Sequence, residues 1–100
     1  MPLSVRTNLP VVVYLDDEPA NRQAFSYALM DHAQVHAFGD PRTALLALGR
    51  MGAVDVVIAD LGRPGMSGVQ FLEESARICP TATRVIVTGL DQTWPVLAAM

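Results

Sequence analysis

No lysine occurs among the 100 residues, and all seven basic residues are arginine. With a net charge of −3, the chain offers no clustered positive charge of the kind that binds a nucleic-acid backbone. A single cysteine excludes an internal disulfide and a zinc site built from several cysteines. No apolar run approaches the roughly 20 residues that span a bilayer, and residues 1–10 contain no apolar segment typical of a signal peptide. We therefore expect a small soluble domain in the cytoplasm that binds neither nucleic acid nor membrane.

The composition is that of a folded domain. Hydrophobic residues make up 51% of the chain, which argues against a disordered protein. A length of 100 residues is typical of one domain, because domains most often contain about 100–150 residues. We expect an N-terminal arm at residues 1–10, followed by a single domain at residues 11–100.

Short apolar runs alternate with amphipathic segments from residue 11 onward. The predicted strands are 11–15, 34–38, 54–59 and 84–88. Of four predicted helices, two begin at Pro19 and Pro41, a third ends before Pro80, and the fourth occupies 91–100. This alternation indicates an α/β fold, in which helices cover both faces of a doubly wound parallel sheet. The polar residues of 34–38 are more typical of an edge strand than of a central one.

Acidic residues follow two of the predicted strands. Asp16 and Asp17 come directly after the first strand, and Asp60 comes directly after the third. If these strands are neighbours, the three carboxylates meet beyond the carboxyl ends of the sheet, where α/β proteins bind ligands. Two like charges about 4 Å apart repel by roughly 4 kcal/mol at an effective dielectric constant of 20, whereas a small domain has only about 5–15 kcal/mol of net stability. Such a cluster suits a hard divalent cation, Mg²⁺ above all.

Helix capping is the alternative explanation of these acids. It accounts for Glu18 and Asp40 and in part for Asp17, because each precedes a predicted helix. It does not account for Asp60, which is followed by Leu-Gly-Arg-Pro-Gly and not by a helix.

Three motifs occur in a specific order along the chain. Residues 13–18 read Val-Tyr-Leu-Asp-Asp-Glu, residues 56–68 read Val-Val-Ile-Ala-Asp-Leu-Gly-Arg-Pro-Gly-Met-Ser-Gly, and residues 85–89 read Val-Ile-Val-Thr-Gly. With these motifs the chain resembles the receiver domain of two-component response regulators over nearly its whole length from residue 11. The resemblance implies a flavodoxin-like fold and a phosphoacceptor signalling domain that is not an enzyme and whose output is a conformational change.

The resemblance also implies a role for each residue of the site. Asp60 would be the phosphoacceptor, which receives a phosphoryl group from a histidine kinase or phosphotransfer protein. Asp16, Asp17 and Asp60 would hold Mg²⁺, with the backbone carbonyl of Gly62 as a further ligand. Thr88 would donate its hydroxyl to a phosphoryl oxygen, although taken alone it is equally well an ordinary residue at a strand end.

The chain departs from the family pattern at its C-terminal end. Receiver domains usually contain five strands and five helices, and the fifth strand normally begins with a lysine that contacts the phosphoryl group. This sequence contains no lysine and stops after the fourth predicted helix, so we expect a receiver domain without the fifth strand and helix. Strand 84–88 would then be an uncovered apolar edge. We expect the chain to be a fragment of a longer protein; the alternatives are a homodimer or an exchanged element that covers this edge, and a local rearrangement.

Two other functions stay open. A receiver-like module could dimerise or bind a partner without phosphorylation, and a response to Mg²⁺ would distinguish it from a phosphoacceptor. A phosphohydrolase with an aspartate nucleophile would need a second acid two residues after Asp60, where this chain has Gly62. That glycine counts against a hydrolase.

Overall fold

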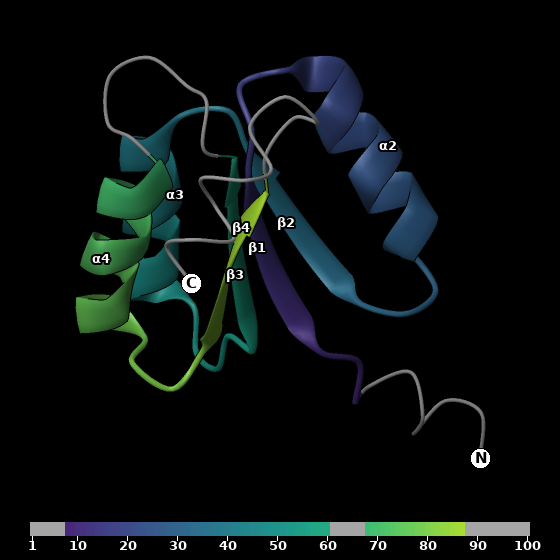
Figure 1. The fold of residues 1–100 in the computed structure, drawn as a ribbon. Coiled ribbons are helices and arrows are strands. Elements are labelled where there is room, and N and C mark those ends of the chain that lie inside the picture. Colours follow the sequence, from purple (N-terminus) through teal and green to yellow (C-terminus); the bar gives the residue numbers. More distant parts are fainter. Residues whose placement is uncertain (1–7, 61–67, 88–100) are drawn as a thin grey trace.

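The computed structural model describes residues 8–60 and 68–87, in which strands and helices alternate (Figure 1). The strands are β1 (Val11–Leu15), β2 (Gln34–Phe38), β3 (Val56–Asp60) and β4 (Thr83–Val87). The helices are α2 (Pro19–Leu29), α3 (Pro41–Arg50) and α4 (Gly68–Ile78). The strands form one sheet in the order β2-β1-β3-β4, and every neighbouring pair is parallel. The predicted doubly wound parallel α/β fold is confirmed.

The predicted elements agree with the structure to within two residues at the strand ends. The first two strands have the predicted bounds, the third begins at Val56, and the fourth begins one residue earlier than predicted, at Thr83. The predicted last residue of the fourth strand, Thr88, lies outside the described residues. The described residues contain no fifth strand and no fifth helix. The helix predicted at 91–100 and residues 1–7 of the predicted arm lie outside the described part of the chain.

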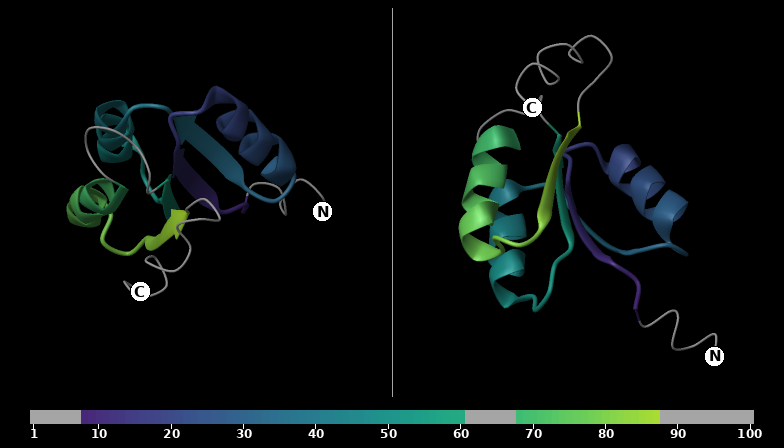
Figure 2. Two further views of the ribbon diagram at one scale, coloured as in Figure 1. Left: turned by 45° about the horizontal axis from the view of Figure 1, so that its top comes forward. Right: turned by 60° about the horizontal axis from the view of Figure 1, so that its bottom comes forward.

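Helices cover both faces of the sheet, but unequally. Figures 1 and 2 show α2 on one face and α3 with α4 on the other. Because side chains alternate along a strand, Val13 and Leu15 of β1 pack in the core beneath α3 and α4, whereas Val12 and Tyr14 face α2. Phe71, at 0% exposure, is the largest fully buried side chain of the core beneath α3 and α4.

The α2 face is less completely buried. Phe25 and Leu29 of α2 are half-buried, and α2 contains no fully buried residue. Ala24 and Ala28 of the same helix are exposed. Among the described elements α2 is the only helix on this face, so no second described helix packs beside α2 and buries its flanks.

Residues 34–38 form an edge strand, as their polar side chains predicted. This strand, β2, forms one edge, and β4 forms the other edge of the described sheet. No helix of residues 8–60 and 68–87 has both the length and the hydropathy needed to cross a membrane.

The two helices that begin with proline start in different ways. Asp40 caps α3 as expected, since its carboxylate accepts a hydrogen bond from the Thr43 backbone N–H at 2.9 Å. Glu18 stands at the N-cap of α2, but its side chain makes no capping hydrogen bond, so the capping interpretation of Glu18 is wrong. Instead, the Glu18 backbone N–H donates to Oδ1 of Asp16 at 3.0 Å. The turn into α2 is therefore closed by Asp16, two residues earlier.

Candidate functional site

Three carboxylates converge at the carboxyl ends of β1 and β3. The two strands are parallel neighbours, with Leu15 opposite Ala59, so the residues that follow them reach the same edge of the sheet. One carboxylate oxygen from each of Asp16, Asp17 and Asp60 lies within 4.8 Å of the others. The sequence predicted this convergence from the positions of the acids after the strands.

Asp16 is the most deeply buried member of the cluster. Its residue is only 3% exposed, and a buried carboxylate is stable only when its oxygens find partners. Oδ2 accepts a hydrogen bond from the Tyr14 hydroxyl at 2.7 Å and another from the Asn21 side-chain amide at 3.2 Å. Oδ1 accepts from the Glu18 backbone N–H at 3.0 Å. These three donors hold the Asp16 carboxylate in one orientation.

The backbone of Asp16 is fixed as firmly as its side chain. Its N–H donates to the carbonyl oxygen of Phe38 at 3.0 Å, which continues the pairing of β1 with β2. Its carbonyl oxygen accepts a hydrogen bond from Nη1 of Arg22 at 2.8 Å. Arg22 belongs to α2, so this bond ties the helix to the end of the strand.

The other two acids are more accessible. Asp17 is exposed, and Asp60 is half-buried at the last position of β3. The cluster thus combines one buried, oriented carboxylate with two that solvent can reach. Carboxylate oxygens in this number are the ligands that Mg²⁺ prefers, so the donor set fits a hard divalent cation.

Tyr14 borders the cluster from the α2 side. It is 5% exposed, and its ring stacks on that of Phe25, with the ring centroids 4.2 Å apart. Burial raises the pKa of the Tyr14 phenol most strongly, and the hydrogen bond to Asp16 and the charges of Asp16 and Asp60 raise it further. The phenol therefore stays protonated, as a donor, over the whole pH range in which the domain is expected to work.

A cavity opens between α2 and the ends of the strands. It measures about 560 Å³ and is lined by Tyr14, Asp16, Asn21, Ala24, Phe25, Asp60 and Val87. Two of the three clustered acids thus face a space that a small anion and its cation could enter. The cavity combines polar groups at the strand ends with an aromatic wall on α2.

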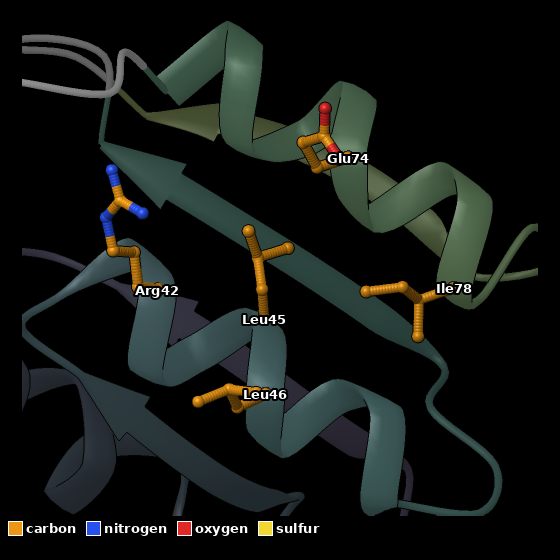
Figure 3. Close-up of a pocket in the computed structure, with 5 residues that line it drawn as sticks. All are labelled: Arg42, Leu45, Leu46, Glu74 and Ile78. Carbon is orange, nitrogen blue, oxygen red and sulfur yellow. The ribbon is translucent and has the colours of Figure 1, made fainter.

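A second cavity, of about 500 Å³, lies between α3 and α4 on the other side of the sheet. Figure 3 shows Arg42, Leu45 and Leu46 on α3, and Glu74 and Ile78 on α4, along this groove. It contains one carboxylate and one guanidinium among apolar side chains. The described residues that line the groove therefore include no set of groups suited to binding a cation or phosphate, and the cluster at the strand ends is the better candidate.

The structure brings together Asp16, Asp17 and Asp60 from the predicted site. Gly62 and Thr88, the other predicted site residues, lie outside the described residues.

Residues that the sequence interpretation did not assign to the site also contact it: Tyr14, Asn21 and Arg22. The sequence did contain one indication for Tyr14. Residues two apart in an extended chain point to the same face, and Tyr14 is two residues before Asp16. The contacts of Asn21 and Arg22 with Asp16 depend on how α2 packs against the sheet. The positions of these two residues in the sequence do not specify that packing.

Comparison with known proteins identifies relatives over almost the whole chain. The family model described as the response regulator receiver domain matches residues 12–100. The hydrogenase transcriptional regulatory protein HoxA of Cupriavidus necator is 27% identical over 89 residues, which are 89% of this chain and 18% of that protein. The chain thus spans less than a fifth of the length of that relative.

Solved structures share the same architecture. A response regulator receiver domain protein from Clostridium thermocellum is 28% identical, with a TM-score of 0.80 over 92% of this chain and 75% of that one. The signal receiver domain of an HD domain-containing protein from Pseudomonas fluorescens Pf-5 is 26% identical, with a TM-score of 0.76 over 90% of this chain and 65% of that one. The chemotaxis protein CheY4 of Vibrio cholerae, at 24% identity, resembles the chain in fold alone, with a TM-score of 0.73 over 90% of this chain and 79% of that one.

Proposed function

This chain belongs to the response regulator receiver domain family, and from that premise we propose that Asp60 accepts a phosphoryl group in a Mg²⁺-dependent reaction. Receiver domains are signalling domains and not classical enzymes. The observation that carries the proposal is the approach of the Asp16, Asp17 and Asp60 carboxylates to within 4.8 Å of one another. The donor would be a phosphohistidine of a histidine kinase or phosphotransfer protein in the cytoplasm, and residues 11–100 would form the receiver domain after an arm at 1–10.

The proposed transfer is a displacement at phosphorus. A carboxylate oxygen of Asp60 forms the new O–P bond, while the N–P bond of the phosphohistidine breaks and the imidazole keeps the electron pair. The product is an aspartyl phosphate at the end of β3. Asp60 suits the nucleophilic role because it is half-buried and lines the cavity that an incoming phosphoryl group would enter.

Asp16, Asp17 and Asp60 would hold the cation, with the backbone carbonyl of Gly62 as a further ligand. Bound Mg²⁺ neutralises charge on the phosphoryl oxygens and so reduces their repulsion of the nucleophile. Asp16, held by three hydrogen-bond donors, would contribute a ligand whose orientation is set before the cation arrives. Thr88 would donate its hydroxyl to a phosphoryl oxygen, and the added charge at the end of β3 would produce the conformational output.

Phosphorylation by a small acyl phosphate tests this function directly. The chain is incubated with the acyl phosphate and Mg²⁺, and its intact mass is measured alongside that of Asp60→Asn. We expect a mass gain of one phosphoryl group in the unmodified chain alone, and none when a chelator removes the cation. An equal gain in Asp60→Asn, or no gain in either protein, would contradict the proposal.

The position of β4 at the edge of the described sheet supports a second candidate function, an interaction module that works without phosphate. Within the described residues β4 pairs with β3 alone, and its Val87 is 39% exposed. An exposed apolar edge strand can pair with another chain, so a second copy or an exchanged element would cover it. Sedimentation with and without acyl phosphate and Mg²⁺ separates the two functions, because this candidate requires a dimer whose affinity is the same in both conditions.

A further inference from the structure

We infer that Tyr14 is a positioning residue, whose hydroxyl fixes the Asp16 carboxylate so that one defined oxygen is offered to the cation. The inference rests on the proposed function of the carboxylate cluster and deepens it. Tyr14 lies in β1 and faces α2, and Asp16 follows the strand two residues later and lines the same cavity as Tyr14. The Tyr14 hydroxyl is 2.7 Å from Oδ2 of Asp16, the shortest of the three hydrogen bonds to this carboxylate.

The hydrogen bonds to Asp16 leave its two oxygens in different states. A carboxylate has about four acceptor positions, two on each oxygen. Oδ2 uses both, because it accepts from Tyr14 and from Asn21, whereas Oδ1 accepts only from the Glu18 backbone among the described residues. With respect to the described residues, Oδ1 therefore keeps one acceptor position, and it is the oxygen through which Asp16 would bind the cation.

The Tyr14 hydroxyl decides which oxygen keeps that position. Rotation of a carboxylate about its last side-chain bond is weakly restricted, so hydrogen bonds must select one orientation. The Tyr14 ring cannot easily follow a rotating carboxylate, because it is stacked on Phe25 of α2 with an interplanar angle of 20°. Asn21, the second donor to Oδ2, also belongs to α2. The orientation of Asp16 is thus coupled to the packing of α2 on the sheet.

Tyr14→Phe removes the hydroxyl and keeps the stacked ring, so it separates positioning from packing. Partners that orient a metal ligand typically contribute 10–100-fold to metal affinity. We expect Tyr14→Phe to bind Mg²⁺ about tenfold more weakly than the unmodified chain, measured by titration at a temperature at which both are fully folded. Tyr27→Phe is the matched control, because Tyr27 is 78% exposed on α2 and does not line the acidic cavity. Its Mg²⁺ affinity should equal that of the unmodified chain.

Crystal structures of the unmodified chain and Tyr14→Phe, both without metal, give a readout that does not depend on Mg²⁺. We expect the Asp16 carboxylate to be rotated or to occupy two orientations in Tyr14→Phe. An unmoved carboxylate would overturn the inference, and so would a Mg²⁺ affinity within twofold of the unmodified chain. If the unmodified chain binds no Mg²⁺, the proposed function fails, and the two structures still decide whether Tyr14 orients Asp16.

Discussion

The guanidinium of Arg22 occupies the space in which a side chain on Gly39 would begin. A Cβ atom on Gly39 would lie 2.6 Å from Nη1 of Arg22, closer than such atoms approach in proteins. The same Nη1 donates to the backbone carbonyl of Asp16 at 2.8 Å. Glycine at position 39, directly after β2, therefore permits the contact by which α2 supports the end of β1.

Gly39→Ala should displace the Arg22 side chain and weaken its hydrogen bond to Asp16. A hydrogen bond that involves a charged group contributes roughly 1.5–3 kcal/mol, and a flexible arginine can recover part of it, so we expect the free energy of unfolding to fall by about 1–2 kcal/mol. Urea unfolding measures the change. Gly52→Ala is the control, because a Cβ there would meet no atom within 4 Å, and we expect its effect to stay within about 0.5 kcal/mol. Equal losses in the two variants would contradict the role of Arg22.

Mg²⁺ should stabilise the fold, and removal of one clustered charge should reduce that effect. At ten times its dissociation constant, a ligand that binds only the folded state adds about 1.4 kcal/mol. Asp17→Asn should be more stable than the unmodified chain without metal, because it relieves repulsion among three carboxylates, and should gain less from Mg²⁺. Asp17 is a better site for this test than Asp16. Both oxygens of Asp16 accept hydrogen bonds, so the NH₂ group of an asparagine at position 16 would face a hydrogen-bond donor and destabilise the fold for a separate reason.

Thermal unfolding over a series of Mg²⁺ concentrations measures both parts of that prediction. Glu73→Gln removes an exposed carboxylate from α4, outside the cluster, and serves as the matched control. Its response to Mg²⁺ should equal that of the unmodified chain. A full Mg²⁺ response in Asp17→Asn would exclude the cluster as the cation site.

Asp40 should make the stability of the domain depend on pH. Its hydrogen bonds from the Thr43 backbone and hydroxyl hold the pKa of the carboxyl below its ordinary value of 3.8. Because the folded-state pKa is the lower one, the carboxylate stabilises the fold above about pH 4, and this contribution is lost as the pH falls through the folded-state pKa. Asp40→Ala should thus be less stable than the unmodified chain at pH 7, by a difference that shrinks below about pH 4.

Asp40→Asn distinguishes the charge from the cap. Asparagine is a good N-cap that does not titrate in this range, so Asp40→Asn should be nearly as stable as the unmodified chain at pH 7. The stability of Asp40→Asn relative to Asp40→Ala should change little with pH. A constant difference between Asp40→Ala and the unmodified chain from pH 7 to pH 3 would refute the prediction.

The sequence predicts the sheet well and the side-chain network around the acids poorly. The bounds of β1 follow from an apolar run that ends at Asp16, and β2 ends where Gly39 interrupts the strand. The start of β3 was predicted two residues early, because Val54 is buried and apolar although it precedes the strand. Hydrophobicity reports burial, whereas strand pairing depends on where the neighbouring backbone lies.

The convergence of Asp16 and Asp60 was predictable because it follows from the order of parallel strands. The role of Tyr14 was not, since an aromatic residue in an apolar run is read as core packing and its hydroxyl partner is set by tertiary structure. Glu18 was misassigned as a cap for a related reason. Its position before Pro19 is typical of a cap, but the competing hydrogen bond of its backbone to Asp16 depends on the turn that the chain makes there.

Asp16 and Asp60 are carried by the two inner strands of the described sheet, but only β3 is the neighbour of the edge strand β4. Asp16 follows β1, which lies between β2 and β3. Asp60 ends β3, which lies between β1 and β4, and it is opposite Val87 of β4, a strand at the rim of the described sheet. Edge strands open locally at a lower free energy than central ones. Separation of β4 from β3 would remove the pairing of Asp60 with Val87 while β3 stays paired with β1, so fraying at this rim would widen access to Asp60 without unfolding of the centre of the domain.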